Sequence, residues 1–143
     1  MRTLQDWFSE YNQSHQNSLN KKIHWICVPS IYFAIVAIVA HFSWLLATVL
    51  LVLSFIFYAR LDLVLACAMA LLNVMIVVLI HNLPVGLGFY VAVFILAWIG
   101  QFYGHQVEGK KPSFFKDLQF LLIGPIWCLD TFLAQASLKR KTC

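Results

Sequence analysis

The stretch IHWICVPSIYFAIVAIVAHF, from Ile23 to Phe42, is 20 residues long and contains no Lys, Arg, Asp or Glu. About 20 apolar helical residues are needed to cross the hydrocarbon core of a bilayer. Three further apolar runs follow, so the sequence predicts an all-α integral membrane protein, a four-helix transmembrane bundle. The predicted transmembrane helices cover residues 23–42, 44–58, 63–80 and 87–103.

The basic residues between these runs give the chain an orientation. All ten Lys and Arg residues lie outside the runs, and they fall on one side of the membrane if the chain crosses it four times. Short loops rich in Lys and Arg stay on the cytoplasmic side, so the N- and C-termini are predicted to be cytoplasmic. The ten residues are Arg2, Lys21, Lys22, Arg60, Lys110, Lys111, Lys116, Lys139, Arg140 and Lys141.

The composition argues against a water-soluble protein. Hydrophobic residues make up 62% of the 143 residues and charged residues only 11%, so a fold in water could not hide the apolar surface. We expect a single membrane domain, residues 1–143, surrounded by membrane lipids. The net charge of +4 lies in the flanks of the runs, without a basic cluster interleaved with exposed aromatic residues, so no nucleic-acid partner is expected. The sequence does not determine the oligomeric state.

Three segments lie outside the four apolar runs and their short turns. Residues 1–20 contain a capping box and an amphipathic stripe, which predict a short helix along the membrane interface followed by a turn. Residues 104–116 are the only extended polar segment late in the chain, and we expect a cytoplasmic loop that carries the functional site. Residues 117–137 have an apolar part too short to cross the bilayer, with Gly124 and Pro125 in its middle. They predict a bent pair of helices that is re-entrant or interfacial.

Five histidines in so apolar a chain need an explanation. An imidazole in hydrocarbon is unfavourable unless it faces a polar partner, a cavity or a metal. The predicted topology puts His15, His24 and His105 at the cytoplasmic end. His41 and His81 lie at the opposite end, roughly 30 Å away across the hydrocarbon. No single metal ion can therefore use both groups.

The cytoplasmic histidines are candidate metal ligands. His15 and His24 converge only if the chain turns between them, and the polar residues 17–20 supply such a turn. Glu108 follows His105 by three residues, so on a helix the two side chains share a face. Imidazoles with a carboxylate suit a non-haem iron(II) site that activates oxygen, and they also suit zinc. The alternative is that these side chains bind phosphates or helix ends at the interface.

Other polar residues leave further functions open. His41 and His81 suit wetted helix ends, and their alternative is an axial pair for haem in an electron carrier. Lys110 and Lys111 are solvated charges or partners of a substrate carboxylate. Asn73, in the middle of the third run, predicts a hydrogen bond between helices. A non-catalytic membrane scaffold is a further possibility.

Several motifs resemble the membrane 2-hydroxy fatty acid dioxygenase family, which was long catalogued as a domain of unknown function. The resemblance extends from residue 11 to about residue 130, and its most specific part is the block around His105. The motifs are Tyr11-x3-His15, Asn20-x3-His24-x3-Val28-Pro29, Trp98-Ile99-Gly100-Gln101-Phe102-x-Gly104-His105-x2-Glu108-Gly109-x2-Pro112 and Gly124-Pro125.

The resemblance implies an iron(II)-dependent dioxygenase that shortens long-chain 2-hydroxy fatty acids by one carbon, a step of fatty acid alpha-oxidation. It implies that His15, His24 and His105, with Glu108 as a further ligand, hold Fe(II) at the membrane surface. The substrate carboxylate and 2-hydroxyl would chelate the metal, and dioxygen would be the second substrate. Eukaryotic members look like endoplasmic reticulum proteins, whereas this short chain resembles bacterial members of the inner membrane.

Overall fold

The computed structural model describes residues 2–110 and 114–141, and this part of the chain is entirely helical apart from turns. Four of its helices are long and apolar enough to cross a membrane, which confirms the predicted all-α membrane bundle. The helices are α1 (Leu4–Gln13), α2 (Ser18–Phe42), α3 (Trp44–Leu61), α4 (Leu63–Asn82), α5 (Leu87–Glu108), α6 (Phe114–Gln119) and α7 (Ile123–Lys141). The candidate spans are α2 to α5.

Each predicted span lies within one of these helices, but the helices are longer. α2 begins at Ser18 because Asn17 caps it, accepting hydrogen bonds from the amides of Leu19 and Asn20. α5 continues to Glu108, so the first residues of the predicted loop 104–116 are helical. It ends at Gly109, whose φ of 75° is the left-handed conformation that glycine adopts easily at a helix end. His105 is therefore held on a helix rather than on a loop.

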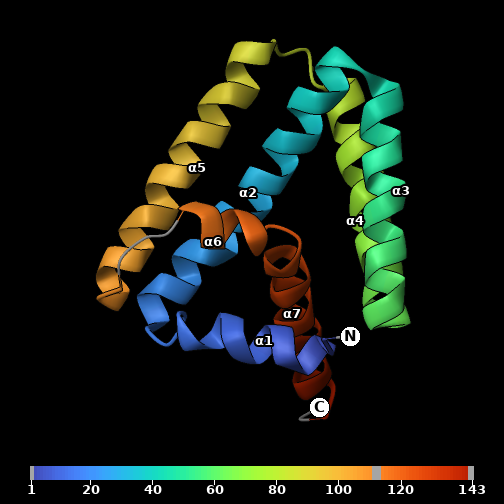
Figure 1. Ribbon diagram of the computed structural model, residues 1–143. Coiled ribbons are helices and arrows are strands. Elements are labelled where there is room, and N and C mark those ends of the chain that lie inside the picture. Colours follow the sequence, from blue (N-terminus) through green and yellow to red (C-terminus); the bar gives the residue numbers. More distant parts are fainter. Residues whose placement is uncertain (1, 111–113, 142–143) are drawn as a thin grey trace.

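The long helix α2 is the centre of the bundle (Figure 1). α5 packs against one side of it, and the α3–α4 pair packs on the other side. The α2–α3 and α4–α5 connections lie at one end of the bundle, whereas α1 lies at the other end. Midway along α2, the Tyr32 hydroxyl donates to Asn73 Oδ1 of α4 at 2.9 Å, which confirms the predicted hydrogen bond between helices.

The C-terminal helices form the bent pair expected from residues 117–137, but the bend comes earlier than Gly124 and Pro125. The bend lies at residues 120–122. Pro125 is the third residue of α7, and proline is tolerated in the first turn because amides there have no acceptor within the helix. The Tyr58 hydroxyl of α3 donates to the Leu122 carbonyl at 2.8 Å. Backbone carbonyls removed from water need such a partner, so this bond fixes the turn against α3.

Close contact between α2 and α5 depends on two glycines of α5. A Cβ atom added at Gly100 would lie 2.7 Å from Cys27 Sγ. One added at Gly104 would lie 2.5 Å from Asn20 Oδ1 and 3.2 Å from the His24 ring. Small residues spaced by four let helices approach closely in membranes, so Gly104 permits α5 to reach the polar end of α2.

Replacing Gly104 with Ala should therefore destabilise the protein, by about 1–3 kcal/mol as for other overpacked sites. Thermal unfolding in detergent measures this change. Gly88→Ala is the matched control, because a Cβ atom there meets no atom within 4 Å. Equal stability of the two variants would show that the α2–α5 contact is not limited by residue 104.

Candidate metal centre

His15 lies in the connection between α1 and α2, and only 3% of its surface is exposed. Its Nδ1–H donates to the Tyr11 carbonyl at 2.6 Å, and its ring stacks on the Tyr11 ring with centroids 4.0 Å apart. The hydrogen bond leaves the Nε2 lone pair free, and this atom is buried with no partner. Both contacts fix the direction in which His15 offers that lone pair.

His24 presents its ring in the same way from the first turns of α2. It is fully buried, and its Nδ1–H donates to the Asn20 carbonyl at 3.0 Å. Its Nε2 is also buried without a partner. Buried polar atoms in proteins nearly always have partners, so these two imidazole nitrogens are candidate metal ligands.

His105 completes the group from the last turns of α5. Its Nε2–H donates to Asp117 Oδ1 of α6 at 3.1 Å, and both side chains are largely buried. A neutral ring that donates from Nε2 keeps its lone pair on Nδ1. A carboxylate behind a histidine is a common arrangement in metal sites, because it orients the ring and makes it a stronger ligand.

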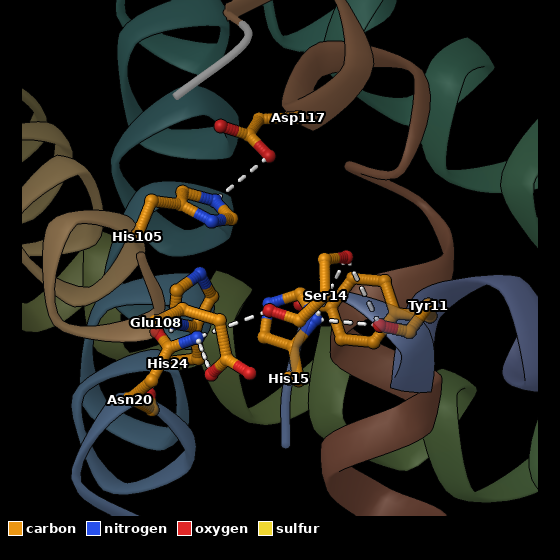
Figure 2. Close-up of polar contacts among 8 residues, drawn as sticks. All are labelled: Tyr11, Ser14, His15, Asn20, His24, His105, Glu108 and Asp117. Atoms are coloured by element: carbon orange, nitrogen blue, oxygen red, sulfur yellow. Dashed lines mark hydrogen bonds and ion pairs between the residues drawn. The ribbon is translucent and has the colours of Figure 1, made fainter. Parts of the chain in front are cut away.

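The three imidazoles converge on one point (Figure 2). One ring nitrogen of each histidine lies within 4.8 Å of the others, and the ring centroids are 4.3 Å apart for His15 and His24 and 4.9 Å apart for His24 and His105. Nitrogen ligands lie about 2.0–2.1 Å from a zinc ion, so two of them are at most about 4.2 Å apart. Small ring rotations would close this difference, and the donor set therefore fits a metal ion with open coordination positions.

Burial also sets the charge of His15. Removal from water lowers the pKa of His15 to about 4, because the charged imidazolium loses its hydration. The neighbouring His105 lowers this pKa as well, whereas the hydrogen bond to Tyr11 raises it. His15 is then neutral at physiological pH, which is the form of imidazole that binds metals.

Glu108 lies beside the histidines, and its carboxylate binds Asn20 (Figure 2) as well as the connection between α1 and α2. It accepts hydrogen bonds at 2.9 Å from the Gln16 amide, the Asn17 amide and the Asn20 side chain. The group of candidate ligands within 4.8 Å of one another does not include Glu108 among the described residues. The observed role of Glu108 is to join the end of α5 to the segment that carries His15.

The remaining predicted site residues lie outside this group. The exposed Lys110 donates from Nζ to the Gln13 carbonyl at 2.6 Å, and Lys111 is outside the described residues. His41 and His81 are exposed at the far ends of α2 and α4, where they line one open pocket with Trp44 and Tyr90. The structure thus keeps the two histidine groups apart, as the topology predicted.

Two polar residues at the site, Asp117 and Gln101, were not among the predicted site residues. Asp117 is only the first residue of the segment 117–137 predicted to form a bent helix pair, and Gln101 appears only within the family motif. Gln101 is 5% exposed, and its Oε1 has no partner. A signal for Gln101 was available, because it lies one helical turn before His105 on α5 and so shares its face. No comparable periodicity connects Asp117 to the histidines.

Comparison with known proteins finds a matching family. The model of a family described as 2-hydroxy-palmitic acid dioxygenase Mpo1-like matches residues 1–60 and 58–136 of the chain. The chain belongs to this family. The two Mpo1-like segments together contain all three clustered histidines, Glu108 and Asp117. No curated protein and no solved structure matches the chain significantly.

Glu108→Ala should lower the affinity for Fe(II) or Co(II) by about 10- to 100-fold, the usual effect of losing a group behind the ligands. The variant frees the segment of His15 without removing an imidazole. Metal titration followed by absorption spectroscopy measures the affinity, and Glu10→Ala is the control because Glu10 pairs with Arg2 instead. If Glu108→Ala abolished binding as fully as His24→Ala, Glu108 would be a ligand.

Asp117→Asn should weaken metal binding by a similar factor, because an amide polarises the His105 ring less than a carboxylate does. The Co(II) absorption spectrum of the variant should also change, since His105 becomes a weaker ligand. Asp62→Asn provides the control, because Asp62 caps α4 and Asn is an equally good cap. An unchanged affinity and spectrum for Asp117→Asn would exclude this role.

Proposed function

We propose that this protein is an iron(II)-dependent dioxygenase that shortens long-chain 2-hydroxy fatty acids by one carbon. One observation supports it above all others: three buried histidines converge with two unpartnered Nε2 atoms, in a chain of the 2-hydroxy-palmitic acid dioxygenase Mpo1-like family. Three histidines with open positions are a suitable ligand set for iron that activates oxygen, although zinc accepts the same donors.

The overall reaction needs no further reductant. A 2-hydroxy acid RCH(OH)COOH and O2 give RCOOH, CO2 and H2O, with the bond between C1 and C2 broken and four electrons passing from these carbons to oxygen. When bound, Fe(II) would supply the redox chemistry that allows dioxygen to react with the substrate. The protein has to hold the ion, orient the acid and keep water away.

The residues of the site suit these tasks. His15, His24 and His105 would hold the ion, while the carbonyls of Tyr11 and Asn20 keep two of the rings in the required tautomer. Asp117 would keep the third ring oriented. Because the rings are buried, water reaches the site only through a restricted path.

The location of the site suits an amphiphilic substrate. The histidines lie at the polar end of the candidate spans, with Lys110 exposed nearby. We place this end in the cytoplasm, because the basic residues gather there. Each methylene that stays in an apolar environment contributes roughly 0.8 kcal/mol, so the alkyl tail can remain in hydrocarbon while Lys110 and Lys111 attract the carboxylate.

The protein purified without oxygen should contain about one iron per chain and should consume oxygen when 2-hydroxypalmitate is added. Mass spectrometry should detect pentadecanoic acid as the product. His105→Ala should lose both iron and oxygen consumption, whereas His41→Ala, from the other histidine pair, should keep both.

Three results would contradict this function. An iron-loaded protein that leaves 2-hydroxypalmitate unchanged is not this dioxygenase. Stoichiometric zinc in place of iron would point to hydrolysis. A haem absorption band that disappears in His41→Ala would favour the electron carrier.

A further inference from the structure

An apolar cavity of about 360 Å³ lies between α2 and α3, next to the turn that joins α6 to α7. Its lining includes Tyr32, Val36, Ala47, Phe57 and Leu122. The volume lies in the range of about 300–1,000 Å³ that is typical of small-molecule sites. Ala47 and Phe57 are ten residues apart on one helix, so the cavity extends about 15 Å along α3.

The polar atoms in this cavity are already bonded within the protein. The Tyr32 hydroxyl donates to Asn73, and the Ser54 hydroxyl donates to the Leu51 carbonyl. Lining residues such as Leu50 and Leu53 are exposed on the outer surface of α3, which would face lipid in a membrane. The cavity is therefore a long apolar space that opens toward the hydrocarbon. The hydroxyls of Tyr32 and Ser54 in its lining are not free to bind a ligand.

A second, much smaller pocket lies between this cavity and the histidines. It measures about 10 Å³, roughly the space for one water molecule, and its lining includes Tyr11, Gln101 and Asp117. Tyr11 stacks on His15, and Asp117 binds His105, so the pocket borders the metal centre. Gln101 Oε1 and Asp117 Oδ2 are buried without a donor. A ligand that enters here must bring a hydrogen-bond donor.

Leu121 connects the two spaces. Among the described residues, it is the one that lines both the apolar cavity and the small polar pocket. It lies in the turn between α6 and α7, and the neighbouring Leu122 carbonyl is fixed by Tyr58. The backbone of the turn is thus anchored, and the Leu121 side chain lies between the apolar cavity and the small polar pocket.

We propose that the apolar cavity between α2 and α3 binds the alkyl tail of the 2-hydroxy fatty acid, with Leu121 at the passage to the metal centre. This inference rests on the proposed function for the identity of the head group. The 2-hydroxyl brings one hydrogen-bond donor, which either Gln101 Oε1 or Asp117 Oδ2 would accept. Phosphatidylcholine is a poorer match, because neither its phosphate diester nor its quaternary ammonium carries a hydrogen-bond donor. Ala47, at the far end of the cavity, should then limit the length of the alkyl tail that fits.

Photocrosslinking tests where the tail binds. A 2-hydroxyhexadecanoic acid with a diazirine near its terminal carbon is added to the wild-type protein in phosphatidylcholine nanodiscs, and labelled peptides are identified by mass spectrometry. Label should fall on residues 47–57, and excess 2-hydroxypalmitate should displace it. Label on the lipid-facing residues of α4, or label that survives this competition, would overturn the proposal.

A substitution tests the length of the cavity. Ala47→Phe should fill the end remote from the histidines, and Ala92→Phe, on an exposed face of α5, is the matched control. Ala47→Phe should weaken binding of the 16-carbon 2-hydroxy acid at least tenfold while leaving the 8-carbon acid within twofold. Competition with the photoprobe measures both affinities. Equal effects on the two acids, in protein that still binds Co(II), would overturn the proposal.

These measurements separate the two proposals. Specific labelling of residues 47–57 without any oxygen consumption would support the tail site and refute the dioxygenase. Oxygen consumption with labelling elsewhere would refute the tail site and support the dioxygenase.

Discussion

The absence of a side chain at residue 104 is the constraint on which the site depends. Only a glycine there lets α5 approach α2 closely enough for His24 and His105 to face one another. The same approach brings Glu108, one turn further along α5, to the side chain of Asn20 and to the backbone that follows His15. One close helix crossing thus organises three histidines from separate segments.

The bilayer explains why the fold was predictable from the sequence. In lipid, the backbone must satisfy its own hydrogen bonds, and hydropathy then reveals the helices. The grouping of His15, His24 and His105 followed from the same topology, because it placed their segments at one end. Helix ends were less accurate, since a helix continues into polar sequence until a residue such as Gly109 ends it.

The parts that the sequence did not reveal depend on packing between distant segments. The spacing of Glu108 from His105 indicates a shared helix face, but not that its carboxylate accepts bonds from residues 16, 17 and 20. Asp117 reaches His105 because α6 brings it back to the last turns of α5, and no periodic pattern encodes that contact. The structure also shows that buried polar atoms without a partner gather around the site. They belong to His15, His24, Asn20, Gln101 and Asp117.

The distance along the chain between the two halves of this site has a consequence for biosynthesis. His15 and Glu108 belong to segments joined by a hydrogen bond across 92 residues, with all four candidate spans between the two ends. Ribosomes deliver the N-terminal imidazoles well before His105 exists. The three rings can meet only after the last span has been inserted in the right direction, so an ion that needed all three would be captured late and would mark a chain whose assembly is complete.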